Sequence, residues 1–377
     1  MADSGDQSLK WYSTREPIIL LVLTVIAVAF FLAVSVLSKA YHARQASQAE
    51  KWYRRAAYDQ KRGYLDRAAS EFRAAELHSR GNFNYQLGLA QTLAALGRTD
   101  EAYSYLLNLR EKQPESGTVN LELARIFAKK GDAATAIRYY HNALYAAWPP
   151  DAENQRLAGR LELIEFLLRQ NDKTQAQSEL LALAANLPPD AGVHSQMGDL
   201  FFRSQDYEHS LAQYQEVLKA NAKDPATLRG AGQSAFESGR YGLARRYLQA
   251  AVEANPSDST SAELLNTAEL VLNMDPFLRR ISVSQRHQIV INAFATAGER
   301  LKACTITGTT GPSFESKWKE MKPHISKLGL KQDPDLVDTA MNLVFAIEQS
   351  ASAQCGAPAG KDQALLLISR LRESNER

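Results

Sequence analysis

Cysteine is almost absent from this chain, since only two occur among 377 residues. Two cysteines are too few for a disulfide scaffold or for a four-cysteine metal site. Both lie in the last quarter of the sequence, at Cys304 and Cys355. A single disulfide could join them, or both could be buried thiols that pack as small hydrophobic groups. The sequence leaves these two possibilities open.

An excess of charge of one sign is also missing, because 44 Lys and Arg face 42 Asp and Glu, for a formal net charge of +2. Nothing therefore indicates the basic surface of a nucleic-acid-binding protein, and we expect no nucleic-acid partner. Glycine is sparse, at 20 residues, whereas 45% of the chain is hydrophobic. This composition permits a packed core and favours helices.

Motifs of the common enzyme classes are missing too. Neither H-E-x-x-H nor G-x-S-x-G occurs, and none of the seven histidines lies near another histidine or a cysteine at metal-ligand spacing. The carboxylates are scattered and suggest no acid–base pair. We therefore expect no catalytic residue, no cofactor and no metal, and hence a protein that is not an enzyme.

A long apolar run near the N-terminus is the first positive signal. The segment from Ile18 to Leu37 has no charged residue, and only Thr24 and Ser35 are polar. As a helix with a rise of ~1.5 Å per residue, it would span roughly 30 Å, the thickness of the hydrocarbon core of a bilayer. Aromatic residues flank it at the positions typical of a membrane interface. The sequence predicts a transmembrane helix over residues 18–37, which would contact the lipid bilayer.

Two other interpretations compete with an anchor that follows a short tail at residues 1–17. A buried core helix would need a polar face, which this run lacks. A cleaved signal peptide agrees with the small residues of Ser38-Lys39-Ala40, but the run exceeds the usual signal-peptide core of about 7–15 residues. We favour an uncleaved, single-pass anchor.

The orientation in the membrane follows less directly. Basic residues balance on the two near flanks, while a wider count favours a cytoplasmic C-terminal side. A disulfide between the two cysteines would favour the opposite side. A short N-terminal tail in a bacterium most often places the rest of the chain in the periplasm. We favour a bacterial inner membrane with the bulk of the chain in the periplasm.

A repeat of 34 residues follows the apolar run, with one gap of 40. Small residues recur at this spacing at Ala68, Ala102, Ala136, Ala176, Ser210 and Ala244. Turn-forming positions recur at Gly63, Gly97, Gly131, Asn171, Gln205 and Gly239. Large apolar residues recur at Phe72, Leu106, Tyr140, Leu180, Tyr214 and Leu248. The small residue allows two helices to approach closely, the turn position ends one helix, and the apolar residues share a helix face.

This pattern resembles the tetratricopeptide repeat, a helix–turn–helix unit of 34 residues. The unit from Pro225 to Asp258 matches best, with Gly232, Gly239 and Tyr241 in the order of the family. The resemblance covers about residues 49–258 and implies an all-α solenoid of about six repeats, coiled as a right-handed superhelix. Its concave surface would bind a peptide or a helix of another protein.

By this resemblance, the first helix of each unit lines the concave face. The residues expected there for protein binding are Asn84, Gln91, Arg125, Lys129, Asp199, Arg203, Arg229 and Gln233, with Glu237 beside them. Arginines among them could hold a carboxylate of the partner in two-pronged fashion, and plain solvation of a polar face is the alternative. The Asn and Lys carboxylate clamp of chaperone-binding repeats is not reproduced.

Helical periodicity continues after the repeats. Residues 259–275 are expected to form a capping helix, and residues 276–377 a small helical domain. Within it, helices are predicted over residues 289–303, 313–322, 335–354 and 362–372. We expect the whole chain to act as a membrane-anchored scaffold or assembly factor. The alternative is that the C-terminal helices have a sensing or enzymatic role of their own.

Overall fold

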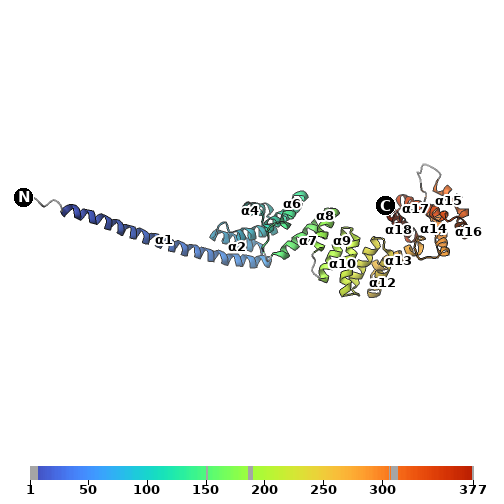
Figure 1. The fold of residues 1–377 in the computed structure, drawn as a ribbon, viewed down its shortest axis with the longest axis horizontal. Coiled ribbons are helices and arrows are strands. Elements are labelled where there is room, and N and C mark those ends of the chain that lie inside the picture. Colours follow the sequence, from blue (N-terminus) through green and yellow to red (C-terminus); the bar gives the residue numbers. More distant parts are fainter. Residues whose placement is uncertain (1–6, 150–151, 186–189, 305, 307–312, 376–377) are drawn as a thin grey trace, which may run out of the picture. The chain divides into compact units, whose positions relative to one another are not determined.

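The structure, a computed structural model, describes residues 7–149, 152–185, 190–304, 306 and 313–375. Within these ranges the regular structure consists of eighteen α-helices and one short 3₁₀-helix, and it contains no strand (Figure 1). The chain forms two compact units, with the boundary between Phe166 and Leu167. The predicted all-α class is confirmed.

The first unit begins with α1 (Gln7–Lys61), a single helix of 55 residues. It contains the predicted transmembrane segment and continues without a break into the first repeat (Figure 1). The sequence analysis treated these as separate elements. No Gly or Pro lies between Ser38 and Lys61 to end a helix, so the two run together.

The remaining helices of the first unit follow in antiparallel order. They are α2 (Leu65–His78), α3 (Phe83–Ala95), α4 (Thr99–Lys112), α5 (Gly117–Lys130) and α6 (Ala133–Leu144), and the unit ends within α7 (Glu153–Arg169). From α1 to α6, each helix packs against the next. The side chains of Asn82 and Ser116 accept hydrogen bonds from backbone N–H groups at the starts of α3 and α5. Such caps each stabilise a helix by about 1 kcal/mol.

The second unit continues the same pattern. It contains α8 (Lys173–Ala184), α9 (Ala191–Arg203), α10 (Tyr207–Ala220), α11 (Pro225–Glu237), α12 (Tyr241–Ala254) and α13 (Ser259–Met274). Aspartates cap α9, α11 and α13, at Asp190, Asp224 and Asp258. From α9 to α13, each helix packs against the next.

The repeat positions predicted from the sequence have the expected geometry. All six small residues are completely buried. All six turn positions have left-handed backbone, with φ between 59° at Asn171 and 80° at Gly63. Glycine adopts this conformation without a Cβ penalty, while Asn171 and Gln205 adopt it at some cost. The helical hairpins therefore follow from local chemistry that repeats along the chain.

The C-terminal helices complete the second unit. They are α14 (Val283–Ala303), α15 (Phe314–Met321), η1 (Lys322–His324), α16 (Lys327–Gln332), α17 (Asp335–Cys355) and α18 (Gly360–Asn375). The helix α18 packs against α13, and α14 packs against α17. One hydrophobic core joins residues of α10–α13, such as Tyr214 and Leu248, to Val290, Val344 and Ile368 of the C-terminal helices. The last hairpins and the C-terminal helices thus share a core.

Candidate protein-interaction site

A row of polar side chains links the first helices of successive hairpins in the first unit. Gln60 on α1 donates to Thr92 on α3 at 3.0 Å. Gln91 on α3 donates to Glu122 on α5, also at 3.0 Å. These contacts join α1, α3 and α5, the first helices of their hairpins. We call the exposed side chains of these helices, and of the first helices α9 and α11 in the second unit, the first-helix face.

Arg125 on α5 extends this row to α7. Its Nε and Nη2 atoms donate to Oε2 of Glu162 at 3.0 and 2.8 Å, and its Nη1 donates to Glu122 at 2.8 Å. Tyr140 on α6 donates its hydroxyl to the same Glu162 at 2.8 Å. Burial alone would lower the pKa of Arg125, but the hydrogen bond with Glu162 and the two carboxylate charges raise the pKa above its usual value.

Arg125 therefore already pairs with a carboxylate of its own chain, whereas the sequence analysis expected it to pair with a carboxylate of another protein. Its two-pronged geometry is satisfied by Glu162, and a buried Glu122 depends on it as well. Glu122 lies three residues before Arg125, a spacing at which opposite charges pair on one helix, so the pairing of these two residues could have been predicted from the sequence. Glu162 follows the six-residue insertion between repeats, where the register of the pattern gave no guide.

The other predicted residues of the first unit are more accessible. Asn84 is exposed at the start of α3. Lys129 is exposed at the end of α5, and its Nζ donates to the backbone carbonyl of Ala94 on α3 at 3.2 Å. Gln91 is half-buried and bonded to Glu122. Asn84 and Lys129 are thus the members of this group whose side chains a partner can reach with least disturbance of the fold.

In the second unit, Asp199, Arg203 and Arg229 are exposed on α9 and α11, and Gln233 is half-buried. Asp199 accepts a hydrogen bond from Tyr214 on α10 at 2.5 Å. Burial and this bond raise the pKa of Tyr214. The Nη1 atom of Arg229 lies 3.7 Å from Asp258. Whether these residues contact another protein stays a prediction.

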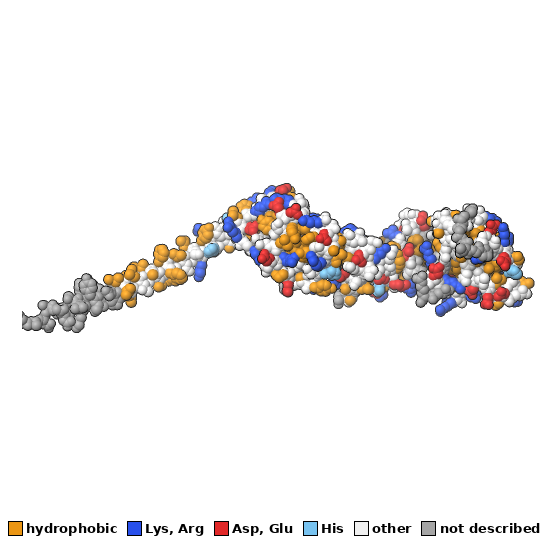
Figure 2. Space-filling view, turned by 90° about the horizontal axis from the view of Figure 1, so that it is seen from above, with side chains coloured by type: hydrophobic (Ala, Val, Ile, Leu, Met, Phe, Trp, Pro, Cys, Tyr) orange, Lys and Arg blue, Asp and Glu red, His pale blue; other side chains and the backbone are white. Residues whose placement is uncertain are grey.

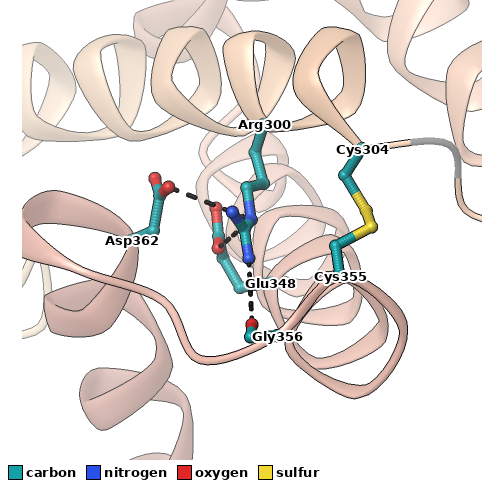
Figure 3. Close-up of a disulfide and its surroundings, with 6 residues drawn as sticks. All are labelled: Arg300, Cys304, Glu348, Cys355, Gly356 and Asp362. Atoms are coloured by element: carbon teal, nitrogen blue, oxygen red, sulfur yellow. Dashed lines mark hydrogen bonds and ion pairs between the residues drawn. A yellow bond between two sulfur atoms is a disulfide. The ribbon is translucent and has the colours of Figure 1, made fainter.

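A buried charge cluster lies in the C-terminal helices (Figure 3). Arg300 on α14 points between Glu348 on α17 and Asp362 on α18, with its Nε 4.0 and 3.9 Å from their carboxylate oxygens. Glu348 is completely buried. Burial and the neighbouring charge of Asp362 raise the pKa of Glu348 to about 7, against an opposing effect of Arg300.

The two cysteines form a disulfide beside this cluster. Cys304 follows α14 and Cys355 ends α17, with their Cα atoms 6.1 Å apart (Figure 3). Of the two possibilities that the sequence left open, the structure therefore has the bridge. It joins the two helices that supply Arg300 and Glu348.

The apolar part of α1 has the character of a membrane segment. It is long enough to cross a bilayer, and an 18-residue window within it has a mean hydropathy of 3.1 and contains no buried residue. Figure 2 shows its hydrophobic side chains in orange along the face in view. Both a membrane anchor and a signal sequence have this character.

Comparison with known proteins identifies the repeats. The tetratricopeptide repeat family matches residues 87–152 and 195–259. No curated protein sequence matches the chain.

Similar solved structures include YrrB, a TPR protein with an unusual peptide-binding site, at 15% identity and a TM-score of 0.41 over 52% of this chain and 97% of that one. The C-terminal part of a TPR repeat-containing protein from Cytophaga hutchinsonii has 13% identity and a TM-score of 0.42, over 79% of this chain and 96% of that one. PilW, a type IV pilus biogenesis factor, has 16% identity and a TM-score of 0.40, over 59% and 98%. The family match and the repeat geometry together show that this chain contains tetratricopeptide repeats.

Proposed function

We propose that this tetratricopeptide-repeat chain is a membrane-anchored scaffold or assembly factor, and that it binds a peptide or helix of another protein on the first-helix face. The observation that carries this proposal is the repetition itself. The first helices of several hairpins present exposed polar side chains, such as Asn84, Lys129 and Arg203. Stacked hairpins of this kind form extended surfaces that suit an extended segment or a helix.

The continuous α1 supports a tether of fixed length. Between Leu37, at the end of the apolar run, and Ala49, the first buried residue of the repeats, the helix advances twelve residues, or about 18 Å. A helical connection, unlike a flexible linker, holds the first hairpin at a set distance from the lipid. We infer that the repeats receive partners near a membrane surface rather than free in solution.

The disulfide supports the side of the membrane that the sequence analysis favoured. Such bonds persist in oxidising compartments, and both cysteines lie on the C-terminal side of the apolar segment. We infer that the repeats lie in the periplasm of a bacterium, on an inner-membrane anchor. A membrane-impermeant thiol reagent would label Cys304 and Cys355 in intact cells only after reduction if this orientation holds.

Site-specific photocrosslinking in the native membrane tests the interaction face. A photoreactive amino acid at Asn84 or Lys129 should capture a defined partner. The same group at Ser104, exposed on the second helix α4, is the matched control and should not capture it. Capture at Ser104 alone, or at none of the three positions, would contradict the proposal.

Charge reversal supplies an independent measurement on the captured partner. Lys129→Glu and Arg203→Glu should each weaken its binding, since both side chains are exposed on first helices. Arg245→Glu, on the exposed side of the second helix α12, is the matched control and should leave binding unchanged. Equal effects of all three variants would show that net charge, not the first-helix face, determines binding.

A further inference from the structure

A pocket of about 440 Å³ lies among the C-terminal helices. Phe277, between α13 and α14, forms part of its apolar lining together with Leu330 of α16 and Val337 of α17. Leu330 and Val337 are buried in the shared core of the second unit. The volume falls within the range of small-molecule sites, and the apolar lining suits a ligand with a hydrophobic body.

His287 on α14 lines this pocket and is 8% exposed. In the part of the chain that the structure describes, its ring makes no hydrogen bond or ion pair. Because the ring lines the pocket, its nitrogens are available to hydrogen-bond a ligand there.

The charges around the pocket favour an anion. Arg286 and Lys331 line it. Among the residues that the structure describes, Arg286 bonds only through its Nε, which donates to the carbonyl of Pro276 at 2.9 Å. The one acidic side chain of the lining, Asp338, is paired with Arg372 at 2.8 Å. The planar guanidinium of Arg286 still has its two terminal nitrogens, the geometry that binds a carboxylate.

We propose that this pocket binds a carboxylate carried on a small apolar body, with Arg286, His287 and Lys331 around the carboxylate and Phe277, Leu330 and Val337 around the apolar part. Two sources supply this chemistry: the C-terminal residue of a peptide, and a free small carboxylic acid. Either ligand gives the C-terminal helices a sensing role of their own, distinct from partner binding on the repeats.

Binding is tested on the full chain in lipid nanodiscs by isothermal titration calorimetry. The probes are N-acetyl-phenylalanine and the pentapeptide tetra-alanyl-phenylalanine, each as the free acid and as the C-terminal amide. The acids should bind at least about tenfold more tightly than the amides, the loss expected when a charge-assisted contact is removed. Tighter binding of the peptide acid identifies a peptide C-terminus as the ligand, and tighter binding of the small acid identifies a free carboxylate.

Four variants connect binding to the pocket. Arg286→Gln should weaken acid binding about tenfold or more, and His287→Phe, which keeps a ring of similar size, about fivefold. Lys331→Gln changes an exposed side chain and should weaken acid binding about threefold. Arg279→Gln, an exposed arginine outside the lining, is the matched control and should bind like the unaltered chain.

Three outcomes of these titrations would overturn the proposal. Acids and amides that bind equally, or acids that do not bind at millimolar concentration, would overturn the proposal. So would acid binding that Lys331→Gln and Arg286→Gln leave unchanged. Because Lys331 is exposed, a failure of the buried variants to fold would still leave Lys331→Gln to decide the matter.

Discussion

Removing the disulfide should loosen one part of the second unit. The bridge closes a loop between positions 51 residues apart, Cys304 and Cys355. In the chain-entropy description, closing a loop of this length stabilises the folded state by about 4 kcal/mol relative to the open chain. The double variant Cys304→Ala/Cys355→Ala should therefore lose up to that amount of unfolding free energy in the helices that the bridge joins, α14 and α17.

Native-state hydrogen exchange measures this loss where it occurs. Amides of α14 and α17 that open through unfolding of this part should exchange up to about a thousandfold faster, since every 1.4 kcal/mol corresponds to a factor of ten. Each single variant, Cys304→Ala or Cys355→Ala, should match the double variant, because either removes the bridge. Peptides from α3 and α5 belong to the other unit and should exchange as before.

The packing of α14 on α17 should keep both helices folded after the disulfide is removed. Val290 and Ala293 of α14 and Val344 and Ile347 of α17 are completely buried in the shared core and do not depend on the bridge. The helices should therefore persist in the double variant. Unchanged exchange in α14 and α17 would refute the loop-entropy reasoning, and complete loss of protection there would show that the core alone cannot hold these helices.

Three further changes test the fold. The pKa of Glu348 is about 7 in the folded protein and 4.5 for the free group, so the folded protein holds a proton on Glu348 between these pH values and loses stability as the pH rises through them. E348Q should remove this pH dependence and raise the unfolding free energy at pH 8 by up to about 3 kcal/mol relative to the unaltered chain. Urea titrations at pH 5 and pH 8 measure both effects. A Cβ on Gly232 would lie 2.7 Å from a leucine side chain, so Gly232→Ala should lower the unfolding free energy by about 1–3 kcal/mol in thermal unfolding. A Cβ on Gly242 meets nothing within 4 Å, so Gly242→Ala should raise the unfolding free energy by about 0.5–1 kcal/mol. Equal effects of the two variants would contradict this description of the packing. Arg125→Ala leaves Glu162 without its cation and should cost about 2 kcal/mol in urea unfolding, and an unchanged midpoint would show that the ion pair contributes nothing.

The repeats were predictable because their requirements are local. A left-handed backbone is needed once per hairpin, and the sequence supplies Gly there four times. Asn171 and Gln205 occupy the same positions with the same geometry, although neither residue alone would have indicated it. Spacing therefore carried information that residue type did not, and the family resemblance rested on the same spacing.

The C-terminal helices were predictable only in part. The sequence analysis started one helix at residue 289, but α14 begins at Val283, where Ser282 and Gln285 form a capping box. That signal, Ser followed three residues later by Gln, was present in the sequence. The six-residue α16 was missed, since so short an element shows no periodicity. The packing of α18 on α13 joins segments about a hundred residues apart, which no local pattern reveals.

Local spacing also shows which helices carry polar side chains, but it does not show which of these side chains are already used within the fold. Helical spacing places Arg125 on a polar face, where an arginine looks available to a partner. Its ligand, Glu162, lies 37 residues further along the chain, and this pairing depends on how adjacent hairpins stack. Some polar residues on first helices thus join neighbouring hairpins, and the exposed ones are those that we propose bind other proteins. Arg125 is held between neighbouring hairpins, so its replacement tests stability, whereas the exposed side chains of Lys129 and Arg203 are the positions to change when binding is tested.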